Sequence, residues 1–298
     1  MSKGAWWVLL LALGLTGPVL AADEPGADKA GADKAQQEYM QKLRALKWVI
    51  GPASVSVGGN STLKLPEGYV YLDPANTAKY EELNENFSSG KEVLVAPKNL
   101  GWNAYLEFGD EGYVKDDEKI DAPAILKTLT ERTEEANEER RRRGWADMHV
   151  AGWSIAPAYN SETKRLEWAT LLRSRGGEGT NFFTKVLGRR GVTTVVLVAR
   201  PEDTTAAVTD LNRLLTGYQF NNGDTYADYR PGDKVAEYGL TGLIVGGAVA
   251  AAVKTGVLKG LWKVIVAGAA ALWKVLVGLV VAAIAGVKSL FRRKSAAG

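Results

Sequence analysis

Two acidic segments of the chain carry residue types that can bind metal ions or move protons. The first includes Asp116 and Asp117, and the second includes Asp224, Asp228 and Asp233. Calcium and magnesium bind several oxygen ligands that converge on a tight loop, but neither segment has the spacing of an EF-hand loop. We therefore expect solvated turns and helix caps here. A metal site built from Asp116, Asp117, Asp224 or Asp228 is the alternative.

The composition excludes several kinds of catalytic site. The chain has 298 residues, no cysteine and one histidine, His149, so disulfides, thiol nucleophiles and cysteine-ligated zinc are ruled out. The sequence contains no nucleophile-elbow serine, no Walker phosphate loop and no zinc-protease motif. It therefore predicts no catalytic residues and no cofactor. An enzyme that uses the acidic segments, with or without a divalent cation, is the alternative.

Arginines and glycines that resemble anion-binding features are interpreted as structural. Arg140–Arg143 follow a run of glutamates at the i, i+4 spacing of an exposed helix face, which we favour over an anion-binding helix end. Arg189 is expected to be held by a carboxylate. Gly176–Gly179 are expected at a hairpin tip, because no helix with a Lys-Ser/Thr start follows them as it does in phosphate-binding loops.

The first residues predict a secretory signal. Lys3 precedes a short apolar core, and small residues follow a Gly-Pro break. This order of basic start, apolar core and small residues is typical of a signal peptide. We expect residues 1–21 to be the signal peptide, cleaved after Ala21 or Ala22. Residues 22–37 are expected to be a flexible linker because they have little to bury.

The far end, residues 238–291, predicts a membrane-associated helical region. Two apolar stretches lie there, Leu240–Leu258 and Val264–Val287. A membrane span needs about 20 mostly apolar residues, and the twelve Val, Ile or Leu residues of the second stretch outweigh its central Lys274. We therefore expect a C-terminal transmembrane helical segment that crosses once, at Val264–Val287.

The basic end of the chain predicts the orientation of this segment. Residues 292–298 include three adjacent basic residues, and such clusters stay in the cytoplasm. One crossing makes 292–298 a cytoplasmic tail, and a two-helix hairpin is the alternative. Lys274 would lie near the middle of the bilayer, where a charge needs a partner. It is the membrane-functional candidate, and it favours self-association through tail helices.

The positive net charge comes from this tail. After Tyr238 the chain has eight lysines and arginines and no acidic residue. Proteins that bind nucleic acid place their positive charge on a folded face, whereas basic residues beside an apolar segment are attracted to anionic lipid. We therefore predict the lipid bilayer as a partner and exclude nucleic acid.

The middle of the chain, residues 38–237, predicts one soluble α+β domain with a largely antiparallel sheet and packed helices. Hairpin signals outnumber β-α-β units there. Val192–Ala199 has the continuous β-branched character of a central buried strand. The other expected strands are 53–57, 61–65, 68–72, 92–96, 103–108, 149–155 and 165–172. The expected helices are 36–48, from Asp73 or Asn76 to about Phe87, from Asp121 to just before Gly144, and 204–215.

Short strings between Trp48 and Gly247 resemble those of a known family. Among them are Leu65-Pro66-Glu67-Gly68-Tyr69, Gly112-Tyr113-Val114-Lys115-Asp116-Asp117, Leu166-Glu167-Trp168-Ala169, Leu187-Gly188-Arg189-Arg190-Gly191 and Tyr226-Ala227-Asp228-Tyr229. In order and spacing the chain resembles a bacterial domain-of-unknown-function family of uncharacterised membrane-anchored proteins. Ala158 departs from the family pattern. The resemblance implies a membrane-anchored envelope protein and assigns no catalytic residues.

The combined signals lead to one functional expectation. The protein is expected in the bacterial cytoplasmic (inner) membrane, with its main domain on the periplasmic side. There it would act as a non-enzymatic interaction or scaffold module that binds another envelope protein.

Overall fold

The computed structural model describes residues 29–246. The helices are α1 (Lys29–Arg44), α2 (Pro74–Leu83), α3 (Ala122–Arg142), α4 (Thr204–Leu214) and α5 (Leu240–Val245), with short 3-10 turns η3 (Pro201–Asp203), η4 (Leu215–Gly217) and η5 (Tyr226–Asp228). The strands are β1 (Val49–Ile50), β2 (Ala53–Val57), β3 (Ser61–Leu65), β4 (Tyr69–Leu72), β5 (Val93–Pro97), β6 (Asn103–Gly109), β7 (Met148–Asn160), β8 (Arg165–Ser174), β9 (Gly177–Leu187), β10 (Val192–Ala199) and β11 (Tyr218–Phe220).

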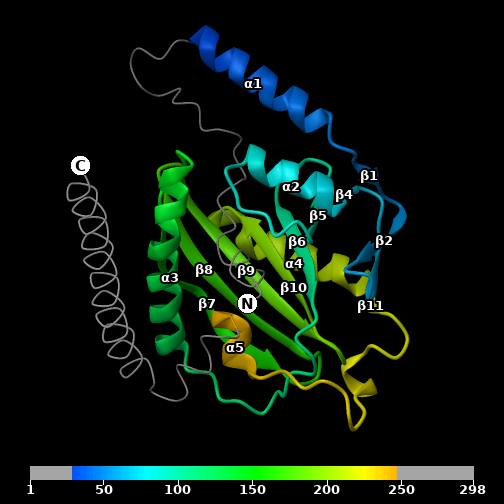
Figure 1. The fold of residues 1–298 in the computed structure, drawn as a ribbon. Coiled ribbons are helices and arrows are strands. Elements are labelled where there is room, and N and C mark those ends of the chain that lie inside the picture. Colours follow the sequence, from blue (N-terminus) through cyan, green and yellow to red (C-terminus); the bar gives the residue numbers. More distant parts are fainter. Residues whose placement is uncertain (1–28, 247–298) are drawn as a thin grey trace, which may run out of the picture. The chain divides into compact units, whose positions relative to one another are not determined.

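Eight of these strands form one antiparallel sheet in the order β1-β4-β5-β6-β10-β9-β8-β7. Figure 1 shows its strands crossing the middle of the molecule. The central strand β10 pairs with both neighbours along its length, so that Val195 lies opposite Leu106 on β6 and Thr184 on β9. A second sheet of three strands has the order β11-β3-β2. The predicted α+β class with a large antiparallel sheet is confirmed.

The main hydrophobic core lies between the large sheet, the small sheet and α4. Successive side chains of a strand point to opposite faces, and Val195, Leu197 and Ala199 of β10 all face this core. The small sheet and α4 supply the opposing side chains, which include Val55, Val57, Leu63, Leu65, Leu211 and Leu214. Burial of these aliphatic groups is the main stabilising contribution to the fold.

The opposite face of the large sheet is covered by helices. The Tyr80 hydroxyl on α2 accepts a hydrogen bond from Asn103 Nδ2 at 2.9 Å. On α3, the side chain of Asn137 is fully buried and both donates to and accepts from the backbone of Met148 on β7, each at 2.8 Å. Because a buried amide needs its hydrogen bonds, this pair fixes the position of α3 along the edge strand.

Most of the predicted elements are confirmed. β2 and β3 occupy the expected residues, and their connection uses Gly58 and Gly59 with φ of 63° and 77°. Asp73 and Asp121 cap α2 and α3 by accepting hydrogen bonds from the backbone N–H three residues on. The eight residues of Val192–Ala199 are all buried, as expected of a central strand.

Two expectations on the element boundaries need correction. α1 begins at Lys29, inside the segment 22–37 expected to be a flexible linker, and ends at Arg44 rather than Trp48. Ala, Lys and Gln, which suit a polar linker, are also strong helix formers. β9 was not expected as a strand. The turn expected at Gly176–Gly179 lies at Arg175 and Gly176 instead, because Gly177–Gly179 already pair with β8. Thr180–Leu187 shows no alternation because both faces of the strand are covered.

The body also extends further along the chain than the predicted domain. Leu240–Val245, expected in the membrane-associated region 238–291, forms α5, which contacts α3 through buried side chains. The Arg132 side chain on α3 donates to the Val245 carbonyl. Among the residues that the structure describes, no helix is both long and apolar enough to cross a membrane. Residues 1–21, expected to be a signal peptide, lie outside the described residues, as do Val264–Val287, Lys274 and residues 292–298.

Leu197→Ala should lower the free energy of unfolding by about 2–5 kcal/mol, because it leaves a cavity in the main core. Ile155→Ala on edge strand β7 is the control, since Ile155 is 44% exposed. Chemical unfolding followed by tryptophan fluorescence measures both. Equal losses in the two variants would contradict the assignment of Leu197 to the core.

Candidate functional site

The carboxylate of Asp116 in the first acidic segment is engaged by side chains of the protein. Asp116 accepts hydrogen bonds from the Tyr159 hydroxyl at 2.7 Å and the Lys164 ammonium at 2.9 Å. Burial opposes ionisation of Asp116, but the bonds from Lys164 and Tyr159 outweigh it and lower its pKa. The side chain of Asp117 is exposed. Asp116 is thus a structural acceptor that joins this segment to β7 and to the β7–β8 turn.

The carboxylates of the second segment are also engaged by the protein. Asp224 is buried and forms an ion pair with Arg190. Asp228 closes a capping box by accepting hydrogen bonds from the Thr225 backbone and hydroxyl. Asp233 accepts two hydrogen bonds from Arg189, both at 2.8 Å. This confirms the expectation that a carboxylate holds Arg189, and these bonds lower the pKa of Asp233 to about 2.

The two acidic segments nevertheless meet, and tyrosines make the contact. The Tyr113 ring stacks on Tyr226 with ring centroids 4.4 Å apart and lies 4.2 Å from the ring of Tyr229. The Tyr226 hydroxyl donates to the Val114 carbonyl at 2.9 Å. No group of three acidic or histidine side chains within residues 29–246 is placed to hold a metal ion. The segments therefore pack together without forming a ligand set.

We call residues 221–238 the strap, because this mostly exposed segment is fastened to the body along its length. Its fastenings include the Arg189–Asp233 and Arg190–Asp224 ion pairs and the tyrosine stack. The Tyr113 N–H donates to the Lys234 carbonyl at 2.8 Å, and the Ala236 N–H donates to the Tyr113 carbonyl at 2.9 Å. The strap therefore holds the chain close to the body up to α5.

A pocket lies where the end of α3 meets the ends of β7 and β8. Gly144, with a φ of 74°, ends the helix in a Schellman motif. The Trp145 N–H donates to the Arg140 carbonyl at 2.9 Å, and the Gly144 N–H donates to the Arg141 carbonyl at 3.0 Å. This turn directs the chain from Trp145 to Asp147 back toward the sheet. Only the glycine at this turn was expected from the sequence.

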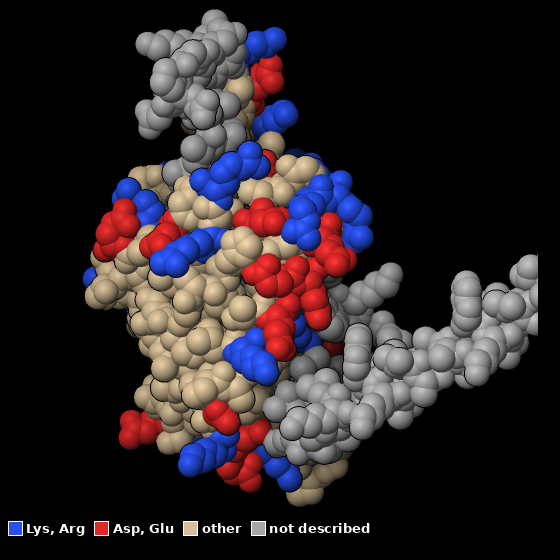
Figure 2. All heavy atoms as spheres, turned by 90° about the vertical axis from the view of Figure 1, so that its left-hand side faces the viewer, with Lys and Arg blue, Asp and Glu red and all other residues tan. Residues whose placement is uncertain are grey.

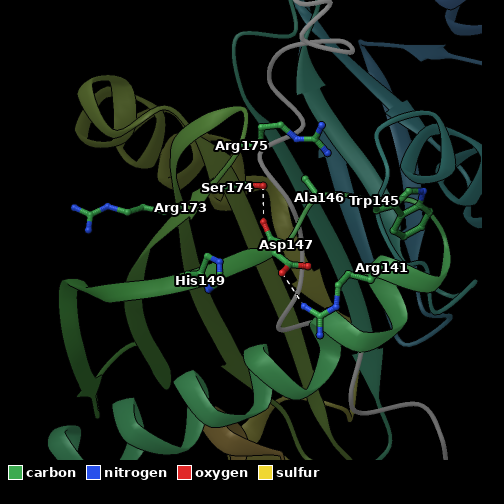
Figure 3. A pocket seen from close by; sticks show the side chains of 8 residues that line it. All are labelled: Arg141, Trp145, Ala146, Asp147, His149, Arg173, Ser174 and Arg175. Carbon is green, nitrogen blue, oxygen red and sulfur yellow. Dashed lines mark hydrogen bonds and ion pairs between the residues drawn. The ribbon is translucent and has the colours of Figure 1, made fainter.

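The pocket has a volume of about 390 Å³, within the usual range for small-molecule sites. Figure 3 shows its lining residues, which are Arg141, Trp145, Ala146, Asp147, His149, Arg173, Ser174 and Arg175. Asp147 lies among them, with its carboxylate 2.7 Å from the Arg141 guanidinium and its carbonyl accepting from the Ser174 hydroxyl at 2.7 Å. Arg173 extends outward at the rim.

Basic side chains outnumber acidic ones in the lining of the pocket, with three arginines against one acidic residue, Asp147. Glu178 pairs with Arg173 at 2.5 Å, and Glu134 lies 2.7 Å from His149. Arg175 is exposed and has no hydrogen-bond or ion-pair partner in the described part of the chain. A guanidinium group has five N–H donors, so the paired arginines are held in place while keeping donors for an anionic group.

An uncharged surface continues from this pocket along β7. In the described sheet β7 is the last strand and pairs only with β8. Residues 150–160 carry no charged side chain. Figure 2 shows a broad uncharged face beside the charged side chains of α3. Register shifts interrupt the β7–β8 pairing, and such irregularities limit uncontrolled edge-to-edge association.

Sequence reasoning missed this pocket because its residues come from separate elements. Arg140–Arg143 were expected on an exposed helix face, and Arg141, Arg142 and Arg143 are indeed exposed, each with an acidic partner. Arg140 is buried instead, donating to the Ala146 carbonyl at 2.6 Å. The available signal was its position four residues before Gly144. A glycine that ends a helix turns the chain back, so that the last helical turn packs against the residues that follow.

The fold defines an α+β protein with a large antiparallel sheet and packed helices. The chain belongs to the family described as protein of unknown function (DUF2167), whose model matches residues 49–285. This confirms the resemblance to an uncharacterised family. No curated protein matches the chain in sequence.

Two solved structures are similar to part of the chain. The solution structure of cyanobacterial PsbP (CyanoP) from Synechocystis sp. PCC 6803 has a TM-score of 0.33 and 7% identity, and the match covers 54% of this chain and 87% of that one. The Saccharomyces cerevisiae Ran-binding protein Mog1p has a TM-score of 0.30 and 8% identity, covering 58% of this chain and 94% of that one. At these TM-scores neither likeness bears on function.

Arg189→Gln should loosen the strap while leaving the sheet intact, because it removes the paired donors to Asp233. Hydrogen exchange of backbone amides should become faster in residues 224–236 and stay unchanged in β10. Arg200→Gln is the matched control, since Arg200 is an exposed arginine that pairs locally with Asp203. Unchanged strap exchange in Arg189→Gln would show that the ion pair does not fasten this segment.

Proposed function

We propose that the protein is an envelope scaffold or interaction module, anchored in the bacterial cytoplasmic (inner) membrane with its body on the periplasmic side. The observation that carries this proposal is the fastened strap. It leads directly to α5, after which the sequence becomes apolar and basic.

A fastened connection suits a scaffold better than a tethered enzyme. An enzyme that acts on diffusing substrates needs only retention at a surface, for which a flexible linker suffices. A module that presents a binding surface to a neighbouring protein gains from a fixed connection, since ordering a flexible segment on binding costs free energy. The strap has at least two ion pairs and a tyrosine stack for this purpose.

The state of the carboxylates also favours a binding role. An enzyme based on the acidic segments requires carboxylates that face a substrate or a metal ion together. Asp116, Asp224, Asp228 and Asp233 instead accept hydrogen bonds from nearby lysine, arginine, tyrosine or threonine groups. This observation reduces support for the alternative of a carboxylate- or metal-dependent envelope enzyme.

The arginine-lined pocket and the uncharged edge beside it are the proposed contact surface. Charge-assisted hydrogen bonds from arginine to a carboxylate or phosphate are strong and directional. The partner is therefore proposed to be an envelope protein that places an acidic group at the pocket. Association of tail helices through Lys274 remains a separate proposal for the membrane region.

The membrane arrangement can be tested on the whole chain because it contains no cysteine. A membrane-impermeant maleimide should label Ser154→Cys, on the exposed edge strand, in cells whose outer membrane has been permeabilised. With one crossing, Ser295→Cys in the basic tail should be labelled only after the inner membrane is opened. Protection of Ser154→Cys would refute the periplasmic assignment. Labelling of Ser295→Cys while the inner membrane is still intact would establish the hairpin.

The same Ser154→Cys variant tests the interaction. A photo-activated cross-linker attached there should capture an envelope protein in intact membranes. Capture should fall when Arg175→Gln is added and should not fall when Arg200→Gln is added. Absence of any captured protein, or equal loss in both double variants, would count against the proposed contact surface.

A further inference from the structure

A buried carboxyl group on α2 has no donor to stabilise its charge. The Glu81 side chain is fully buried, and neither of its oxygens has a hydrogen-bond donor among the described residues. An ionised carboxylate can only accept hydrogen bonds, and burying one without donors costs much more free energy than burying a neutral acid. The position therefore suits the protonated form of Glu81.

The neighbouring carboxylate has the opposite surroundings. Glu92 accepts from the backbone N–H of Ser89 at 2.9 Å and from that of Lys91 at 3.2 Å. It also accepts from the hydroxyl groups of Ser88 and Ser89. These donors come from the loop that joins α2 to β5, residues 84–92, which we call the α2–β5 loop. The Glu92 carboxylate thus holds the loop in place by accepting hydrogen bonds from its backbone and hydroxyl groups.

The two carboxyl groups have opposite pKa shifts. Burial raises the pKa of Glu81 and the nearby Glu92 raises it further, against a smaller lowering by the Ser88 hydroxyl. Burial alone would also raise the pKa of Glu92, but hydrogen bonds from Glu81, Ser88 and Ser89 lower it below its usual range. The buried oxygens of Glu81 without a donor, beside a Glu92 that accepts from the loop N–H groups, favour one proton on the pair, held by Glu81.

Other titratable groups surround this pair. Tyr80 on α2 and Tyr105 and Glu107 on β6 interact with it directly. Tyr39 on α1, Lys91 in the loop and Lys185 on β9 interact with those groups in turn. Glu107 lies 2.9 Å from the Ser89 hydroxyl, and the Lys185 ammonium donates to the Thr194 hydroxyl at 2.9 Å. None of these groups donates a hydrogen bond to Glu81, so they do not offset its charge through a direct contact.

We propose that Glu81 is protonated in the folded protein at neutral pH and donates its O–H to Glu92, forming a proton-dependent lock that holds the α2–β5 loop closed. The lock acts on the candidate pocket through Phe87, which is a buried member of the loop. The Phe87 ring lies 5.1 Å from that of Trp145, a pocket-lining residue. The Arg143 guanidinium lies 4.9 Å from both rings.

Loss of the proton should therefore open the loop and disturb the pocket wall. A carboxyl group whose folded pKa is raised stabilises the closed state fully below its ordinary pKa, and this stabilisation is lost as the pH rises toward the folded value. Over that interval the opening equilibrium should increase by up to about tenfold per pH unit. The direction is closed at lower pH and progressively more open at alkaline pH.

Infrared spectroscopy of the full chain in detergent tests the protonated state. The carbonyl band of a protonated carboxyl group should be present at pH 7, should be lost in Glu81→Gln and should remain in Glu82→Gln. Glu82 is the control because it is the next residue and is exposed. In the wild type this band should persist well above the ordinary range of glutamate. Its disappearance between about pH 4 and 6 would overturn the proposal even if Glu81→Gln failed to fold.

Hydrogen exchange tests the lock. In the wild type, the exchange of backbone amides in residues 84–92 should become faster from pH 6 to pH 9 than it does in Glu81→Gln measured at the same pH values. The variant cannot lose the proton, and its amide can still donate to Glu92. Equal pH dependence in both proteins would overturn the lock. The coupling to the pocket rests on the proposed function, but the infrared and hydrogen-exchange measurements do not. If both gave the expected results while no partner was captured, the proposed function would be refuted and the lock would stand.

Discussion

Complete burial of β10 is the constraint on which the rest of the structure depends. Each of its eight residues is buried, although they point alternately to the two faces of the sheet. A strand of this kind needs an apolar layer on both sides. The small sheet and α4 supply the layer on one side, and helices α2 and α3 supply the layer on the other. The elements that form the pocket and the strap are arranged around these two layers.

The core beside the small sheet is mainly aliphatic and aromatic, whereas the helical layer contains buried amide and carboxyl groups. Asn137 on α3 forms hydrogen bonds to the backbone of β7, and Asn103 donates to the Tyr80 hydroxyl. Glu81 on α2 interacts with Glu92, which precedes β5. Buried polar groups position elements more specifically than aliphatic contacts do, provided that their hydrogen bonds are made. The registers of α2 and α3 depend on these few groups.

The sequence was sufficient where one local signal decided the structure. The run Val192–Ala199, the caps Asp73 and Asp121, and Gly144 after the arginines were each correctly interpreted, because capping and strand burial depend on adjacent residues. β9 was missed since a strand covered on both faces loses its alternation. α1 was expected to start later because helical and linker compositions overlap in Ala, Lys and Gln.

The candidate site was less predictable because its residues meet only in the folded chain. Asp116 and Asp224 were chosen for their chemistry, but their partners, Lys164 and Arg190, lie far away in the sequence. The same is true of Tyr113 and Tyr226, whose stacking brings the acidic segments together. Glu81 gave no signal in the sequence, since its properties come from burial and from a neighbour on another element.

The position of the strap also has a mechanical consequence. It lies in series between the strands of the large sheet and the residues that follow α5, so tension applied from the end of the chain reaches α5 and then the strap before any strand of that sheet. The Arg189–Asp233 pair and the tyrosine stack would bear this load first. Their rupture would lengthen the connection while leaving the β10 core intact. Under such a load the strap would therefore yield before the large sheet does.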